Sequence, residues 1–162
     1  MHLKTDAEFF TCEYCCNIHF PAANEDGVRV LEPAQESCPA CHVGLAHAAI
    51  SGHRIRYCER CRGMLLGMDT FADIVQDLRS RRDTTADAPR PPDWNDLNRK
   101  RSCPQCGNLM DTHLYGGPGN VVIDDCEHCA LVWLDYGELQ RIVRAPDHHY
   151  AIEDAPVRTD SE

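Results

Sequence analysis

Pairs of cysteines are the residues of this sequence best suited to chemistry. Four C-x2-C pairs fall into two sets, Cys38/Cys41 with Cys58/Cys61 and Cys103/Cys106 with Cys126/Cys129. Sixteen residues separate the pairs of the first set, and nineteen separate those of the second. Two such pairs across a short spacer are typical of a zinc ion bound by four thiolates. The sequence therefore predicts two zinc ions, one for each set.

A further pair, Cys12 and Cys15, lies near the start of the chain and is followed by His19. It supplies two ligands where zinc needs four, so two interpretations stay open. One is a third metal site completed by His19, by Cys16 or by a residue from elsewhere. The other is an incomplete zinc knuckle, a C-x2-C turn without a second pair, whose thiols are free.

The pair Cys12/Cys15 could also share one ion with Cys38/Cys41, which would leave Cys58 and Cys61 without partners. An internal repeat argues against this pairing. Cys38 matches Cys103 at an offset of 65 residues, and Cys58 matches Cys126 at an offset of 68. The difference of three residues falls in the spacer, where a hairpin loop can absorb it.

Each spacer has the pattern of a β-hairpin that carries its two cysteine pairs together. In the first set, residues 45–50 and 53–57 are expected to be strands joined at Ser51-Gly52. In the second set, the glycine-rich run 116–120 is expected to join strands at 114–115 and 121–123. A shorter strand is expected at 28–31.

A short apolar stretch and then a helix are expected after the last cysteine of each set. The first helix has apolar residues at 71, 74, 75 and 78, with Asp69 as its expected N-cap. The second has them at 139, 142 and 143, with Asp135 and Glu138 as a capping-box-like pair and Pro146 as its end. Each helix is expected to cover its own hairpin.

These elements predict a small, metal-stabilised α+β fold of two tandem zinc ribbons, each a β-hairpin with two knuckles followed by a short helix. The predicted organisation has five parts, listed here. They are an N-terminal knuckle and strand segment (1–37), ribbon 1 with its helix (38–82), a proline-rich linker (83–101), ribbon 2 with its helix (102–145) and an acidic tail (146–162). Trp94 in the linker is expected to dock on the rest of the chain.

The second ribbon resembles the transcription factor IIB-type zinc-ribbon family of small bacterial proteins. The resemblance rests on C-P-x-C-G at Cys103–Gly107, on Cys126 and Cys129, and on the run W-L-D-x-G-E-L at residues 133–139. Residues 38–82 are similar to a diverged second copy, which keeps the four cysteines and Gly63 but replaces that run. The resemblance implies zinc binding and a ribbon fold, and it implies little about biological role.

Four cysteines close the coordination sphere of zinc, whereas catalytic zinc usually keeps an open position. The zinc is therefore expected to be structural, and the protein is not expected to be an enzyme. Thiol redox chemistry is less favoured, because the βαβ context of thioredoxin-like C-x2-C motifs is missing. The nearby histidines, at 42, 53, 113 and 128, are expected to be surface residues or to support the ligands.

The net charge of −10 opposes non-specific binding to nucleic acid. Eight metal-bound thiolates add −8 and two zinc ions add +4, which lowers the total to −14. Only residues 38–101 are basic, with arginines around Cys58 and Cys61 and again at 79–82 and 99–101. We therefore expect a structural zinc protein that acts as a protein-interaction or adaptor module, with a link to transcription, while nucleic-acid binding through ribbon 1 is the alternative.

The first residues, 1–8, contain no apolar run typical of a signal peptide, and no stretch of the chain is apolar for long enough to span a bilayer. Eleven cysteines without a signal peptide favour metal-bound thiolates in a reducing compartment. The sequence thus predicts a cytoplasmic protein with an unidentified protein partner.

Overall fold

The structure is a computed structural model that describes residues 21–83, 87–88 and 90–146. It also describes the backbone of three two-residue strands, β1 (His2–Leu3), β2 (Phe10–Thr11) and β3 (Ile18–His19), which form a small antiparallel sheet of their own. The side chains of Cys12, Cys15 and His19 lie outside the described part. The candidate third zinc site therefore stays a prediction.

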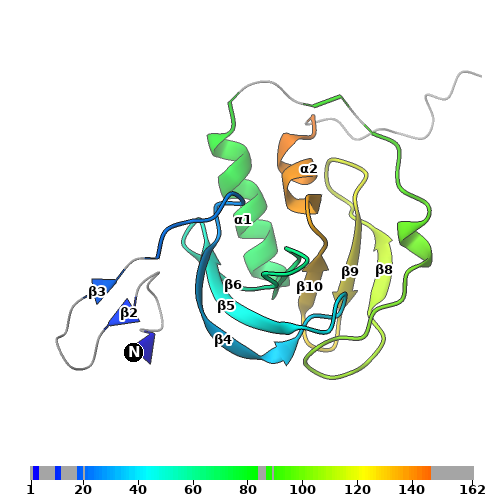
Figure 1. The fold of residues 1–162 in the computed structure, drawn as a ribbon. Coiled ribbons are helices and arrows are strands. Elements are labelled where there is room, and N and C mark those ends of the chain that lie inside the picture. Colours follow the sequence, from blue (N-terminus) through cyan, green and yellow to red (C-terminus); the bar gives the residue numbers. More distant parts are fainter. Residues whose placement is uncertain are drawn as a thin grey trace, which may run out of the picture.

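The main body is one antiparallel sheet with the strand order β4-β5-β6-β7-β10-β9-β8 (Figure 1). Ribbon 1 contributes β5 (Gly44–Ile50), β6 (His53–Tyr57) and β7 (Met64–Gly67). Ribbon 2 contributes β8 (Asp111–Leu114), β9 (Val122–Cys126) and β10 (Leu131–Leu134). Both predicted hairpins are present, and the apolar stretch after each last cysteine is a third strand.

The two ribbons join edge to edge, because β7 pairs antiparallel with β10. We call this pair of strands the seam. At the centre of this seam Leu65 lies opposite Trp133, and these two residues occupy equivalent positions four residues after Cys61 and Cys129. The register therefore places an approximate two-fold axis at this pair of residues, as in a symmetric dimer. The two ribbons of this chain thus meet as the subunits of such a dimer would.

The first strand of the main sheet, β4 (Arg29–Ser37), is nine residues long, so the strand predicted at 28–31 is present but continues to residue 37. Pro33 lies inside β4, and the pairing with β5 is irregular on both sides of it. Proline is tolerated there because β4 is an edge strand and bulges absorb the missing N–H donor. Pro33 therefore does not end the strand.

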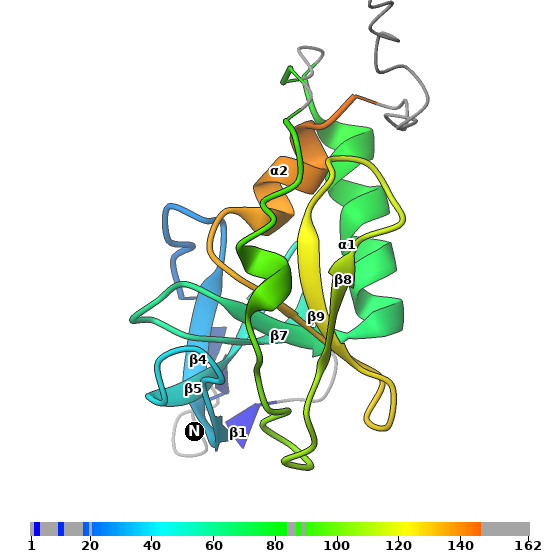
Figure 2. The same cartoon turned by 90° about the vertical axis from the view of Figure 1, so that its right-hand side faces the viewer.

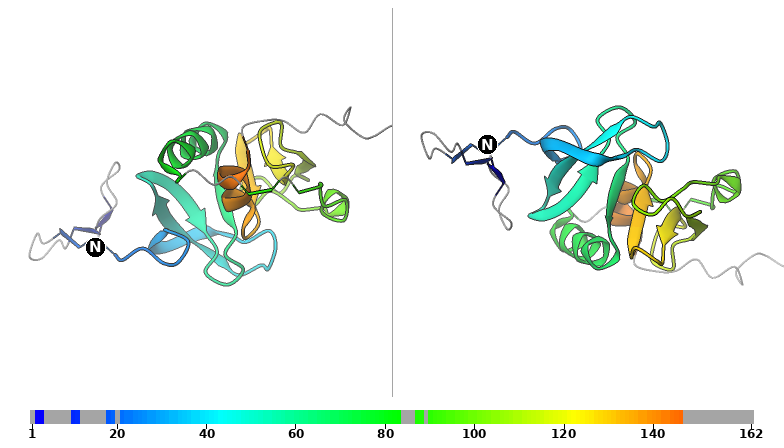
Figure 3. Two further views of the ribbon diagram at one scale, coloured as in Figure 1. Left: turned by 90° about the horizontal axis from the view of Figure 1, so that it is seen from above. Right: turned by 90° about the horizontal axis from the view of Figure 1, so that it is seen from below.

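The sheet is buried on both faces, and the alternation of side chains along β7 and β10 separates two cores. Leu66 and Val132 point into the first, which includes the helices α1 (Met68–Arg81) and α2 (Glu138–Arg144). Leu65 and Trp133 point into the second, which includes four of the cysteines. Figures 1 and 3 show both helices on one face of the curved sheet.

The helices bury the predicted apolar stripes, with Phe71 and Ile74 of α1 and Leu139 and Ile142 of α2 almost fully covered. As predicted, α1 packs on β6 and β7 of its own ribbon, but it also contacts α2 and reaches β10 of the other ribbon. Among the described residues no helix combines the length and apolar character needed to cross a bilayer. The two ribbons share one helical layer.

Neither helix has the predicted side-chain N-cap, because the capping position is Gly67 for α1 and Gly137 for α2. Asp69 lies inside the first turn of α1, where its charge suits the helix dipole. The Asp135–Glu138 pair is half confirmed: the backbone N–H of Asp135 donates to Glu138 Oε2 at 2.7 Å. The carboxylate of Asp135 has other partners, described below.

The segment between the ribbons runs past α2 and then along β8, where it forms a short 3-10 helix, η1 (Asp96–Asn98) (Figure 2). It is attached at several points: the Asp87 N–H donates to Arg144 O at 2.9 Å, and the Asn120 side chain donates to Arg90 O at 3.2 Å. Trp94 is 62% exposed, so the expectation that it docks on the chain was wrong. The Asn98 side chain of η1 donates to the backbone carbonyl of Trp94 at 3.2 Å, while the indole is left in solvent.

Candidate metal centres

Each zinc knuckle is a tight turn that needs one residue with a left-handed backbone. The residue directly after the second cysteine has a positive φ in all four knuckles: 61° at His42, 62° at Arg62, 76° at Gly107 and 51° at Ala130. In three knuckles the N–H of this residue donates to the carbonyl of the first cysteine, as from Arg62 to Cys58 at 2.8 Å. The turn directs two thiols to one side of the chain.

The first cluster brings together the thiols of Cys38, Cys41, Cys58 and Cys61, whose four Sγ atoms lie within 4.8 Å of one another. The Sγ atoms of Cys38 and Cys61 are 3.5 Å apart, and those of Cys41 and Cys58 are 3.4 Å apart. The backbone N–H groups of Ala40 and Cys41 both point at Cys38 Sγ at 3.4 Å. Burial raises the pKa of Cys38 overall, while these N–H donors favour its thiolate and partly offset burial.

The second cluster brings together Cys103, Cys106, Cys126 and Cys129 in the same arrangement. Its Cys106 and Cys126 Sγ atoms are 3.6 Å apart. Thiolates on a tetrahedral zinc ion with Zn–S bonds of about 2.3 Å would be about 3.8 Å apart. The two clusters therefore fit two zinc ions, and they contain the eight cysteines that the sequence predicts as ligands.

The protein environment shifts the acidity of the cluster thiols in both directions. An amide N–H near the thiolate lowers the pKa of Cys41 to about 7, with Val43 as the donor, and the amide of Asn108 likewise lowers the pKa of Cys106. Burial raises the pKa of Cys61 and, to about 12, that of Cys129. Four thiolates together need a cation to balance them, which zinc supplies.

The histidines near the cysteines take no part in either cluster. Each of the two four-cysteine clusters consists of cysteines alone. His42 is exposed at the turn of its knuckle, and His128 is exposed between Cys126 and Cys129. His113 lies on β8, beside carboxylates rather than thiols.

A network of charged groups, which the sequence did not predict, braces the second cluster. The buried Arg101, two residues before Cys103, donates to Asp124 Oδ2 at 3.1 Å and to Asp135 Oδ2 at 2.6 Å. Asp135 also accepts from Trp133 Nε1 at 3.0 Å and pairs with Arg99 at 3.0 Å. Within the run 133–139, Trp133 thus contributes its indole to the core, Asp135 pairs with the two arginines, and Glu138 begins α2.

Glu138 lies at the start of α2, buried beside this network. Burial is the largest cause that raises its pKa, and the nearby Asp135 carboxylate adds to it, so the pKa of Glu138 is about 8. The ordinary value is 4.5, so the folded protein binds a proton here that the unfolded chain releases at neutral pH. The contribution of Glu138 to stability must therefore fall as the pH rises from 4.5 to 8.

The substitution Glu138→Gln is expected to remove this pH dependence, because the amide does not ionise and its oxygen can still accept from the Asp135 N–H. The difference in unfolding free energy, variant minus wild type, should grow with pH between 4.5 and 8 by up to about 1.4 kcal/mol per unit. Chemical denaturation of the zinc-loaded proteins across this range measures it. Asp69→Asn, on the exposed first turn of α1, is the control, and parallel curves for Glu138→Gln and wild type would contradict the prediction.

The arginines of ribbon 1 are largely engaged within the protein. Arg62 pairs with Asp26 at 2.5 Å and lies 4.3 Å above the ring of Tyr136, and Arg56 pairs with Glu36 at 2.8 Å. Arg79 donates to Ile142 O at 2.6 Å, at the C-terminal end of α2. Three of the arginines that suggested a nucleic-acid surface thus neutralise carboxylates of the protein or cap a helix.

An open groove of about 500 Å³ separates the first knuckles of the two ribbons. The knuckle at Cys38 and the segment that leads into Cys103 form its walls. The lining residues are Ser37, Cys38, Pro39, Ala40, His42, Arg99, Lys100, Arg101, Ser102, Cys103 and Pro104. Lys100 is exposed there, whereas Arg99 and Arg101 are paired with carboxylates.

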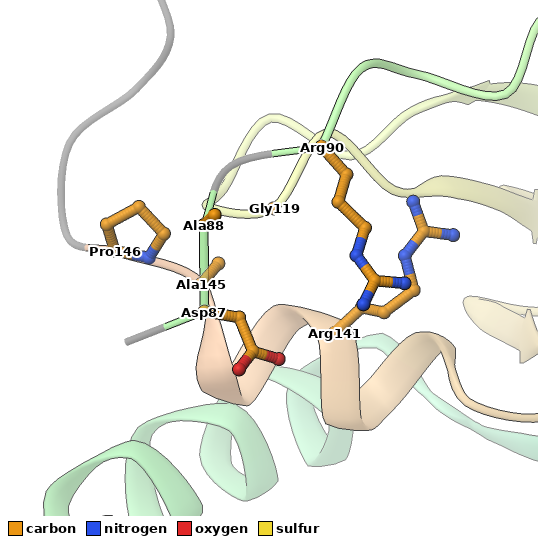
Figure 4. Close-up of a pocket in the computed structure, with 7 residues that line it drawn as sticks. All are labelled: Asp87, Ala88, Arg90, Gly119, Arg141, Ala145 and Pro146. Carbon is orange, nitrogen blue, oxygen red and sulfur yellow. The ribbon is translucent and has the colours of Figure 1, made fainter. Parts of the chain in front are cut away.

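A second cavity lies where the linker crosses the end of α2, between Asp87, Arg90 and Arg141 (Figure 4). Its volume is about 20 Å³, which holds one water molecule and no larger ligand. A third hollow, of about 270 Å³, lies beside Tyr57 and Arg62, so the groove between the knuckles is the largest of the three and the better candidate for binding a partner.

A comparison with family models agrees with this architecture. The model described as a transcription factor zinc-finger matches twice, over residues 37–77 and 102–145, which together make up just over half of the chain. Each match contains one of the two cysteine clusters and the strands that carry it. No curated protein and no solved structure matches the chain. With two matched copies and two four-cysteine centres, the chain belongs to the transcription factor zinc-finger family, as a tandem zinc ribbon.

Proposed function

We propose that this protein is a non-enzymatic zinc-stabilised scaffold that docks an extended segment of a partner protein in the groove between its two first knuckles. The observation that carries the proposal is the groove itself, which only the pairing of both ribbons creates. The description of the family supports a partner in transcription. Closed four-thiolate spheres support a structural and not a catalytic role for the metal.

The chemistry of the lining favours a protein over a nucleic acid. Two of its three strongly basic side chains, Arg99 and Arg101, are already paired with Asp135. Each zinc centre with four thiolates carries a charge of −2 beside the groove. Lys100 remains as the exposed cation, which suits a single carboxylate of a peptide better than a run of phosphates.

Charge reversal in the groove is expected to weaken binding of the partner. The partner segment would be identified by photo-crosslinking from position 102, followed by mass spectrometry, and its affinity measured with purified components. Lys100→Glu should weaken binding at least about tenfold, since it replaces an attraction with a repulsion. Arg60→Glu is the matched control, because Arg60 is exposed on the second knuckle of ribbon 1, outside the groove.

The alternative is tested with the same variants. A salt series with DNA and RNA should show no binding that depends on Lys100. The proposal is wrong if nucleic acid binds at low salt and Lys100→Glu abolishes it. It is also wrong if crosslinks from the groove recover no protein, or if both charge reversals weaken the partner equally.

A further inference from the structure

A cluster of two aspartates and a histidine lies at the edge of the sheet, apart from the cysteine centres. The ligand atoms of Asp111, His113 and Asp125 all lie within 4.8 Å of one another. Asp111 and His113 are two residues apart on β8 and so share a face of the strand, and Asp125 on β9 is the direct cross-strand partner of Asp111. We propose that these three side chains bind a divalent transition-metal ion, with water in the remaining positions.

The cluster is independent of the zinc in ribbon 2. Side chains alternate along β9, so Asp125 and Ile123 share a face opposite to that of Cys126. Ile123 belongs to the core beneath the helices, whereas Cys126 belongs to the core at the knuckles. The proposed ion therefore lies on the helix side of the sheet, at its exposed edge.

The orientation of the imidazole presents a ligand atom to the cluster. His113 Nδ1 lies 2.9 Å from Leu114 O, a carbonyl that can only accept, so the proton of the neutral ring is held on Nδ1. Nε2 then directs its lone pair at the carboxylate oxygen of Asp125, with which it is in close contact. Nε2 and this carboxylate need a proton or a metal ion between them. Burial opposes a proton on His113, but the contacts with Leu114 O and Asp125 outweigh burial and raise the pKa of His113, so a proton takes this place when no metal ion is bound. A backbone carbonyl on the other ring nitrogen is the usual support of a metal-bound histidine.

The balance of charge favours a divalent ion over a proton. Like charges directly opposite one another in an antiparallel pair destabilise it, and Asp111 and Asp125 are opposed in this way. Within the described part of the chain neither carboxylate forms an ion pair with lysine or arginine. A proton on His113 would leave the cluster at −1, whereas a divalent ion with neutral His113 brings it to zero.

The ligand set indicates which ions would bind. One imidazole nitrogen and two carboxylate oxygens suit Mn²⁺ and Zn²⁺ better than soft ions that prefer thiolates. Neighbouring ligand atoms at right angles on an ion, each about 2.1 Å from it, are about 3 Å apart, so His113 Nε2 and the Asp125 carboxylate must move slightly apart, and the exposed Asp111 must rotate, to hold the ion. The exposed position predicts an exchangeable ion rather than a permanent one.

The test uses the full chain loaded with zinc and titrated with Mn²⁺, followed by electron paramagnetic resonance of the free ion. Mn²⁺ is chosen because its preference for oxygen and nitrogen keeps it from the thiols of Cys12 and Cys15. Wild type should bind one Mn²⁺ in addition to its zinc. His113→Gln and Asp111→Asn should each weaken this binding at least about tenfold. His53→Gln should leave it unchanged, because this strand histidine of ribbon 1 belongs to no such cluster among the residues that the structure describes.

Asp111→Asn separates the proposal from a simple histidine–aspartate ion pair, because it leaves the contact between His113 and Asp125 in place. Zinc content and circular dichroism establish that each variant is folded. Equal Mn²⁺ affinity in wild type and His113→Gln, or no Mn²⁺ bound by wild type at millimolar concentration, overturns the proposal. A third zinc ion that is lost in His113→Gln belongs here, whereas one lost only in Cys12→Ser belongs to the N-terminal pair.

Discussion

Removal of zinc is expected to unfold both ribbons together, and not only the strands beside each ion. The cysteines Cys38, Cys58, Cys103 and Cys126 are at most 4% exposed and form one core with Leu65 and Trp133 of the seam. Structural zinc contributes on the order of 10–16 kcal/mol in isolated zinc-finger peptides. Whole domains are stable by only about 5–15 kcal/mol, so the loss of one ion exceeds what the shared sheet can absorb.

The decisive measurement is hydrogen exchange of β5 and β6 in ribbon 1 after Cys126→Ser has removed a ligand from ribbon 2. These amides should lose their protection although their own four cysteines are intact. Ser102→Ala, next to Cys103 but not a ligand, is the control that should retain both zinc ions. Full protection of β5 and β6 in Cys126→Ser would show that the ribbons fold independently and that the seam is weak.

The substitution Gly63→Ala is expected to destabilise the protein through the seam. Gly63 lies in ribbon 1 against the indole of Trp133 from ribbon 2, which is fully buried. A Cβ atom at residue 63 would overlap the indole, lying 2.6 Å from its Cη2, and would also lie 3.1 Å from Leu134 O. Overpacking of this kind typically costs about 1–3 kcal/mol, because the rigid backbone on one side and the packed ring on the other cannot both move.

Unfolding free energies of the zinc-loaded variants test this through a double-mutant cycle. Trp133→Ala alone should cost about 3–5 kcal/mol, and adding Gly63→Ala to it should cost far less than in wild type, since the indole is gone. Gly44→Ala is the matched control, because a Cβ there meets no atom within 4 Å. Additive effects of Gly63→Ala and Trp133→Ala would be inconsistent with a contact between them.

Much of each ribbon could be predicted from the sequence because its signals are local. C-x2-C spacing, the turn at Ser51-Gly52 and the apolar stripe of α1 each depend on neighbours within a few residues, and the structure contains all three. The length of β4 was underestimated, since Pro33 is a strong local stop signal. The strand continues past Pro33 because it pairs with β5 on both sides of this residue.

The seam and the charge network could not be predicted, because they join residues far apart in the chain. Nothing near Leu65 indicates that it lies opposite Trp133, 68 residues later. The arginines around ribbon 1 and the linker suggested a surface, since a sequence does not say which carboxylate reaches which guanidinium. Arg101 and Asp124 carried one weak signal: charged residues beside a buried metal site usually need a partner.

The residues at the seam also determine which ribbons can pair with each other edge to edge. Residue 131 of ribbon 2 is the counterpart of Gly63, and it is leucine. Two copies of ribbon 2 could not associate through β10 in the same register, because a leucine side chain would stand where the indole lies. Joining unlike halves in one chain also makes their association independent of protein concentration. Duplication therefore allowed one ribbon to carry the large indole of Trp133 and the other to carry Gly63, which leaves space for it. Two identical subunits cannot differ in this way.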